Sequence, residues 1–155
     1  MRTRGAANQS LYRARLLLAA WDRARGEPVP ETQLQGAFYP AVRLHLRQAY
    51  GWFLLAVSGV AEASVADLPS TTVDLPAPEP GKARMPELAE FEQLERSGWV
   101  QQLWDDDELE ATPLHSASKD LLVSDQNKPG PRVIQSWIDQ FEVTMARMDD
   151  SLNEY

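Results

Sequence analysis

One stretch, residues 42–60 (VRLHLRQAYGWFLLAVSGV), constrains the fold of this chain more than any other. It belongs to a segment, about residues 32–62, in which apolar residues recur with the period of an α-helix. Several of its leucines lie off the main apolar stripe, so the helix is apolar around much of its circumference. Such a helix must be covered on most sides, which is typical of the central helix of a bundle. Because Pro40 removes one backbone hydrogen bond, we expect a kink or a break there.

Further segments predict helices that can cover the central one. Residues 8–25, 86–97 and 132–155 each carry one apolar stripe at helical spacing, and a short amphipathic piece lies at 99–110. The apolar positions of these segments are Leu11, Ala14, Leu18, Trp21, Leu88, Phe91, Leu94, Trp99, Val100, Leu103, Trp104, Ile134, Trp137, Ile138, Phe141, Met145, Met148 and Leu152. We therefore predict an all-α, single-domain protein (1–155), built as a bundle of four to five helices.

Residues 63–85 connect the second and third predicted helices and have no helical period. Together with Pro86 this segment contains five prolines, and we expect a long, extended, partly polyproline-like connection. Long connections of this kind are uncommon inside a compact domain, so we expect it to be the most mobile part of the chain. Pro86 itself suits the first turn of the next helix, and Gly98 suits its end.

The composition excludes several classes of protein. The chain has no cysteine, hence no disulfide framework, no thiolate metal site and no cysteine nucleophile. Its longest weakly polar stretch, residues 49–61, is shorter than the roughly 20 residues that span a bilayer. The first apolar run, residues 16–21, is too short for a signal peptide. We therefore expect a cytoplasmic protein with no membrane partner.

The net charge of −8 is distributed unevenly along the chain. Residues 1–62 carry eight arginines and four acids, whereas residues 63–155 carry seven basic and nineteen acidic side chains. The opposite charges of the two halves favour attraction within the molecule or between subunits. The overall excess of acid disfavours nucleic acid as a partner, because phosphates need a basic surface. An Arg-rich face on the first helix leaves an acidic partner open.

His45, one of two histidines, is the first candidate for a functional residue. On the helical wheel it lies with Val42 and Ala49 on the apolar face, whereas Arg43 and Arg47 point away from that face. We therefore expect a buried, neutral imidazole that is hydrogen-bonded to a neighbouring helix. Desolvation would then lower its pKa.

Four aromatic residues suggest other roles. Tyr39 and Tyr50, together with His45 near the proline kink, would line a pocket for a small ligand or an anion. Trp99 and Trp104 lie in a short helical piece beside an acidic run. Because aromatic residues are enriched at the centres of interfaces, these two are the candidates for an interface with a second chain.

Motifs for metal-dependent or nucleophilic catalysis are missing from the sequence. Glu-x-x-His precedes neither His45 nor His115, and His-Glu-x-x-His does not occur. Neither histidine follows an arginine at the spacing of the HEPN-type helical ribonucleases. The acidic run 105–110 lacks the glycine and the spacing of a calcium loop, and we interpret it as solvated surface. We therefore predict no catalytic residue, no metal and no cofactor, and a protein that is not an enzyme.

Three segments of the sequence resemble a known family. They are NQSLYRARLLLAAW (8–21), MPELAEFEQL (85–94) and SWIDQFEVTMARMDDSL (136–152), in this order along the chain. Over roughly its whole length, the chain is similar to a family of small helical proteins from gammaproteobacteria that is classed only as a domain of unknown function. The resemblance implies a helical fold and implies no catalytic residue. The chain departs from the family at Pro40 and in the proline run 76–80.

The function that the sequence favours is that of a non-catalytic interaction or scaffold protein. Such a protein buries apolar helix surface against another protein, or against a second copy in a homodimer. A small-ligand or anion-binding bundle with a pocket near His45 is the main alternative. A third is a degenerate relative of helical nucleases, which would need a basic groove formed by Arg13, Arg15, Arg43 and Arg47.

Overall fold

The computed structural model of the protein describes residues 1–78, 80, 81, 83–105 and 128–153. Its helices are α1 (Thr3–Ala24), α2 (Glu31–Val57), α3 (Glu87–Ser97), α4 (Trp99–Asp105) and α7 (Pro131–Asn153). Two short 3₁₀ turns, η1 (Val65–Asp67) and η2 (Thr72–Asp74), lie in the connection between α2 and α3. The prediction of an all-α bundle is confirmed.

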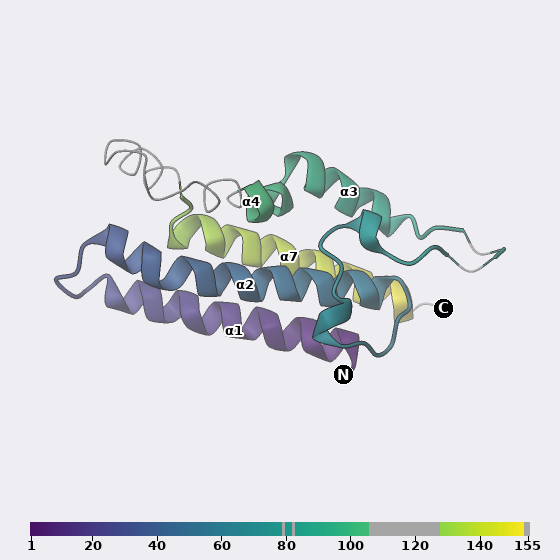
Figure 1. Ribbon diagram of the computed structural model, residues 1–155, viewed down its shortest axis with the longest axis horizontal. Coiled ribbons are helices and arrows are strands. Elements are labelled where there is room, and N and C mark those ends of the chain that lie inside the picture. Colours follow the sequence, from purple (N-terminus) through teal and green to yellow (C-terminus); the bar gives the residue numbers. More distant parts are fainter. Residues whose placement is uncertain (79, 82, 106–127, 154–155) are drawn as a thin grey trace.

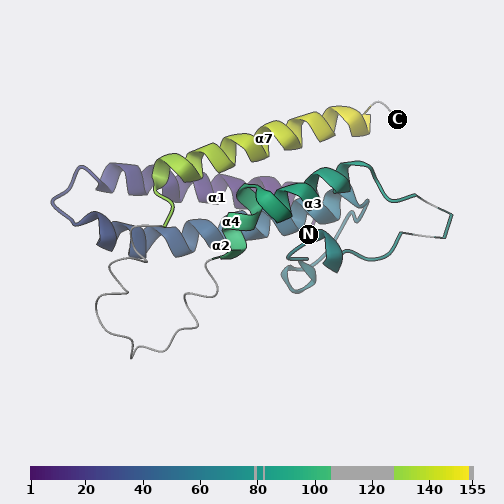
Figure 2. The same cartoon turned by 90° about the horizontal axis from the view of Figure 1, so that it is seen from above.

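The first two helices, α1 and α2, lie side by side in opposite directions and are joined by a short turn (Figure 1). α7 packs along this pair, and α3 and α4 lie over α2 and α7 on the side that faces away from α1 (Figures 1 and 2). α2 contacts α1, α4 and α7. It is therefore the central helix that its apolar circumference predicts.

Small residues bring α1 and α2 close together. Ala6, Ala7 and Ala14 of α1 are almost completely buried. At the far end of the pair, Trp21 stacks on Phe38 with ring centroids 6.2 Å apart. The contact surface of the two helices thus continues along their whole length, and it forms one wall of the core.

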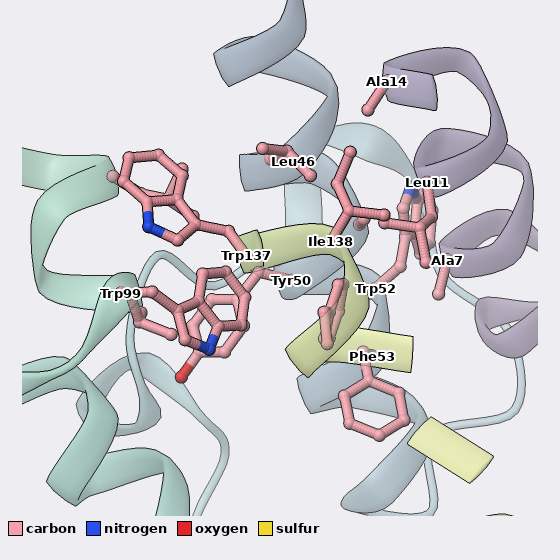
Figure 3. Close-up of a cluster of buried hydrophobic side chains, with 14 of the residues drawn as sticks. Ala7, Leu11, Ala14, Leu46, Tyr50, Trp52, Phe53, Trp99, Trp137 and Ile138 are labelled. Carbon is pink, nitrogen blue, oxygen red and sulfur yellow. The ribbon is translucent and has the colours of Figure 1, made fainter. Parts of the chain in front are cut away.

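Aromatic rings from four helices fill the centre of the core. Tyr50 and Phe53 of α2, Phe91 of α3, Trp99 of α4 and Phe141 of α7 have ring centroids 5.4 to 6.4 Å apart. Most of these pairs meet edge to face, the arrangement that aromatic quadrupoles prefer. Figure 3 shows the rings of Tyr50 and Trp99 side by side between α2 and α4. The cluster joins α3 and α4 to α2 and α7.

The stripe predicted for the last helix is confirmed for every position that the structure describes in atomic detail. The buried members are Ile134, Trp137, Ile138, Phe141, Met145 and Met148. The side chain of Leu152 lies outside the described residues. The boundaries predicted for α3 are also confirmed, with Pro86 before the helix and Gly98 after it.

Pro40 does not break α2, which continues from Glu31 to Val57. The lost hydrogen bond would have joined the amide of residue 40 to the carbonyl of Gly36, and both residues are exposed. Water can therefore replace the missing donor, so a break is not required. α2 also ends earlier than the expected residue 62, because Gly59 adopts a positive φ of 81° that ends the helix.

The proline-rich connection is not featureless, because its first half is fixed to the core. Each 3₁₀ turn is closed by a capping box, formed by Ser64 with Asp67 and by Thr71 with Asp74. The backbone of Pro69 lies so close to α2 that a Cβ atom on Gly51 would meet its carbonyl oxygen at 2.9 Å. The mobility expected for residues 63–85 stays a prediction.

Candidate interaction surface

One side of the α1–α2 pair is left uncovered by the other helices that the structure describes. Arg4 and Arg15 of α1 form ion pairs with carboxylates of α7, so the flank that carries them faces α7. At about 100° per residue, Arg13 and Leu16 lie on the flank that faces away from α7. We name the uncovered surface the outer face. It consists of Arg13, Leu16, Ala20 and Arg23 from α1 and Ala37, Ala41, Leu44 and Gln48 from α2. Tyr12 lies outside it, because it lines a pocket between α1 and α7.

The register between the two helices brings the members of the outer face together. The stack of Trp21 on Phe38 sets the register. Because the helices are antiparallel, counting back along α1 and forward along α2 from this stack places Leu16 and Leu44 at the same height to within about one helical turn. The effect of the Arg13 charge on His45 agrees with this register. The two leucines therefore belong to one continuous surface across the seam between α1 and α2.

Two large apolar side chains of the outer face are exposed to solvent. Leu16 is 51% exposed and Leu44 is 53% exposed. A single exposed apolar residue is ordinary, but neighbouring ones mark sites of interaction on soluble proteins. On the helical wheel, Ala20 and Ala41 lie between the leucines at the seam, where their small side chains allow another chain to approach closely.

The outer face is also basic. Arg13 and Arg23 make no ion pair with the residues that the structure describes, whereas Arg25 at the end of α1 pairs with Glu31. None of the eight residues of the face is acidic. This arrangement agrees with the Arg-rich face that the sequence predicts for the first helix.

His45 lies at the edge of this surface and is half-buried between α2 and α1. Burial lowers its pKa, the positive charge of Arg13 lowers it further, and the Gln48 side chain acts in the opposite direction. The predicted direction of the pKa shift is confirmed. The predicted hydrogen bond to a neighbouring helix is wrong, because Nδ1 has no partner among the described residues and Gln48 belongs to α2 itself.

Tyr39 and Tyr50 do not join His45 in one pocket. The two tyrosines are buried, and they point to the same side of α2 because eleven residues make about three turns. His45 lies more than about 100° away from both around the helix axis. The Tyr50 hydroxyl donates to Glu95 Oε1 at 2.6 Å, and burial together with this carboxylate raises the pKa of Tyr50.

Glu95 connects Tyr50 to the proline-rich connection. Its two carboxylate oxygens accept the backbone N–H and the hydroxyl of Thr72, both at 2.8 Å. One carboxylate therefore joins α2, α3 and η2. Because these bonds are satisfied within the protein, we interpret the group as a structural junction.

Arg43 and Arg47 occupy a different position from the one that the wheel predicts. The sequence places them away from the apolar face, but the structure covers them with α4. Nε of Arg43 and Nε and Nη2 of Arg47 donate to the carbonyl oxygen of Leu103 at 2.7 to 2.9 Å. The guanidinium of Arg47 also lies 4.3 Å from the centroid of the Trp104 ring. The last carbonyls of a helix lack donors, and these arginines supply them to α4.

Trp99 and Trp104, the residues predicted for an interface, differ in their surroundings. Trp99 is 5% exposed, and its ring contacts Tyr50 and Phe141, so it belongs to the core. Trp104 is half-buried beneath Arg47. Sequence reasoning missed the arginine pair on α4, although two arginines four residues apart on a central helix were a usable signal.

The basic groove that a nuclease relative would need is not formed. Arg15 faces α7 and pairs with Glu142, whereas Arg13 belongs to the outer face. Arg43 and Arg47 lie beneath α4, on another side of α2. The four arginines therefore point in three directions.

Other expected features lie partly outside the described residues. Asp105 is exposed, whereas the rest of the acidic run and His115 fall in the part that the structure does not describe. Among the described residues, no group of three or more side chains is arranged to hold a metal ion. None of the described helices has the length and apolar character needed to cross a membrane.

Comparison with known proteins agrees with the resemblance seen in the sequence. The chain belongs to DUF6586, a family of unknown function, whose family model matches residues 1–155. No curated protein and no solved structure matches the chain. The gammaproteobacterial range of the family stays a prediction.

Proposed function

We propose that this member of the family is a non-catalytic interaction protein that binds a protein partner through its outer face. The observation that carries the proposal is the exposure of Leu16 and Leu44 on one face of two long helices that pack against each other. Removing half-exposed side chains of this size from water would contribute roughly 1 kcal/mol each. Two packed helices also hold the surface in one conformation, which lowers the entropy cost of binding.

Site-specific photo-crosslinking tests this function. A photoreactive phenylalanine analogue at position 16 or 44 should give a discrete adduct of higher mass when the protein is irradiated in its own cells. Position 143 on α7 provides the matched control, because Val143 is 69% exposed but lies outside the outer face. Equal adducts at all three positions, or none at positions 16 and 44, would refute the proposal.

Light scattering coupled to size-exclusion chromatography decides whether the partner is a second copy. The experiment is repeated over a range of protein concentrations. A mass that rises to twice the monomer would assign the crosslinked adduct to a homodimer, whereas a constant monomer mass would assign it to another protein. A cytoplasmic location and a single domain over residues 1–155 remain predictions of the same proposal.

A further inference from the structure

We propose that the outer face takes an acidic amphipathic helix of a different protein. This inference rests on the proposed function and adds the chemistry of the partner. It is carried by the charge and the shape of the outer face.

Charge argues against a second copy as the occupant. If two copies met through this face about a twofold axis, the same surface would lie on both sides of the interface. Both copies would then bring Arg13 and Arg23 into the same interface, with no acid on the face to pair with them. Like charges brought together in this way oppose association. A partner that carries carboxylates instead satisfies both guanidiniums.

Shape favours a helix over an extended segment. The outer face lies on two parallel ridges that carry Leu16 and Leu44, with Ala20 and Ala41 at the seam between them. A helix that lies along this seam can place apolar side chains at i, i+4 and i+7 against the leucines and alanines. Both edges of the seam are helices, so no unpaired sheet edge is available to an extended chain.

The spacing of the two arginines adds a requirement for the partner. Arg13 and Arg23 lie ten residues apart on α1, which corresponds to about 15 Å. A partner helix of about three turns covers this distance. Its acids should therefore flank an apolar stripe on one side and lie about ten residues apart.

The first test uses a synthetic peptide. The peptide has about 16 residues, which is roughly four helical turns. It carries leucines at i, i+4 and i+7 and two glutamates ten residues apart. Binding is measured by fluorescence anisotropy. The peptide should bind the wild-type protein, and Arg13→Glu combined with Arg23→Glu should weaken binding about tenfold. Arg132→Glu is the matched control, because Arg132 is an exposed arginine of α7 outside the outer face. Equal weakening by the control would overturn the proposal.

A charge exchange keeps the test independent of any effect on folding. The same peptide with lysines in place of glutamates should bind the Arg13→Glu, Arg23→Glu protein more tightly than it binds the wild type. A lysine peptide that binds the wild type as well as the glutamate peptide would refute an acidic partner. If crosslinks form at positions 16 and 44 but the glutamate peptide does not bind, the surface is correct and its proposed occupant is wrong. Crosslinks that join two copies would likewise replace the acidic partner with a homodimer.

Discussion

Two neighbouring residues of α2, Arg43 and Leu44, have the opposite burial from the one that their chemical character predicts. Arg43 is 5% exposed, whereas Leu44 is 53% exposed. α4 covers the arginine side of the helix and needs donors for its last carbonyls, which the guanidinium supplies. No described helix covers the leucine side. The burial of a residue on a central helix therefore depends on which element packs on its side of the helix. A covered side chain can donate hydrogen bonds to that element, whereas an uncovered side chain remains available to another molecule.

Replacing the two residues separately should give the largest contrast. Arg43→Ala should lower the free energy of unfolding by about 3 kcal/mol, because the substitution removes a buried donor and leaves a cavity beneath α4. Leu44→Ala should change it by less than about 0.5 kcal/mol, because the leucine is exposed. Urea denaturation of both variants measures the difference. Equal losses would mean that the outer face is part of the folded core.

Two glycines of α2 extend the comparison to the backbone. Gly51→Ala should cost about 2 kcal/mol, because the new Cβ would meet the carbonyl oxygen of Pro69 at 2.9 Å. Gly36→Ala should stabilise the protein by up to about 1 kcal/mol, because nothing lies within 4 Å of the new atom and alanine favours a helix. Thermal unfolding followed by circular dichroism distinguishes the two signs. A stabilising Gly51→Ala would show that the connection does not dock on α2.

The pH dependence of the free energy of unfolding tests the contacts of Tyr50 on the covered side of α2. Its pKa is raised in the folded protein by burial and by Glu95, so the folded state keeps a proton that the unfolded state loses near pH 10. The free energy of unfolding should therefore fall above that pH, with a contribution from Tyr50 of about 1.4 kcal/mol per pH unit. Tyr50→Phe should remove this contribution. Parallel curves for the two proteins between pH 9 and about 11.5 would contradict the assignment.

The smallest expected effect is a change in the pKa of His45 when a charge is removed from the outer face. Arg13→Gln removes a positive charge beside His45, so the pKa of His45 should rise towards its ordinary value. Arg132→Gln on α7 should leave that pKa unchanged. An NMR titration of the imidazole resonances measures both variants. No difference between them would place Arg13 too far from His45 to support the register of the outer face.

The parts of the fold that follow from local pattern could be predicted from the sequence. Pro86 and Gly98 bound α3 because both act through their own backbone, and α7 has one apolar stripe because only one of its sides is covered. The position of Arg43 could not be predicted, because it depends on α4, some sixty residues later in the chain. The wheel describes a helix in isolation and does not state which neighbour will cover a polar flank.

The candidate surface was predictable only in part. An Arg-rich first helix is visible in the sequence, and Arg13 and Arg23 do lie on its exposed side. The exposure of Leu44 is not visible, because a leucine within such an apolar helix is expected to be covered. His45 had no distinctive local signal for its position at the edge of the seam, which depends on the register between α1 and α2.

The capping boxes of the proline-rich connection have a consequence for the order in which the molecule opens. Each turn closes its hydrogen bonds within four or five residues, so it can persist when the connection leaves the core. To leave the core at η2, the connection must break the bonds between Thr72 and Glu95. The connection should therefore detach as a preformed unit, and its amide protons should exchange in one step that is distinct from the global unfolding of the long helices.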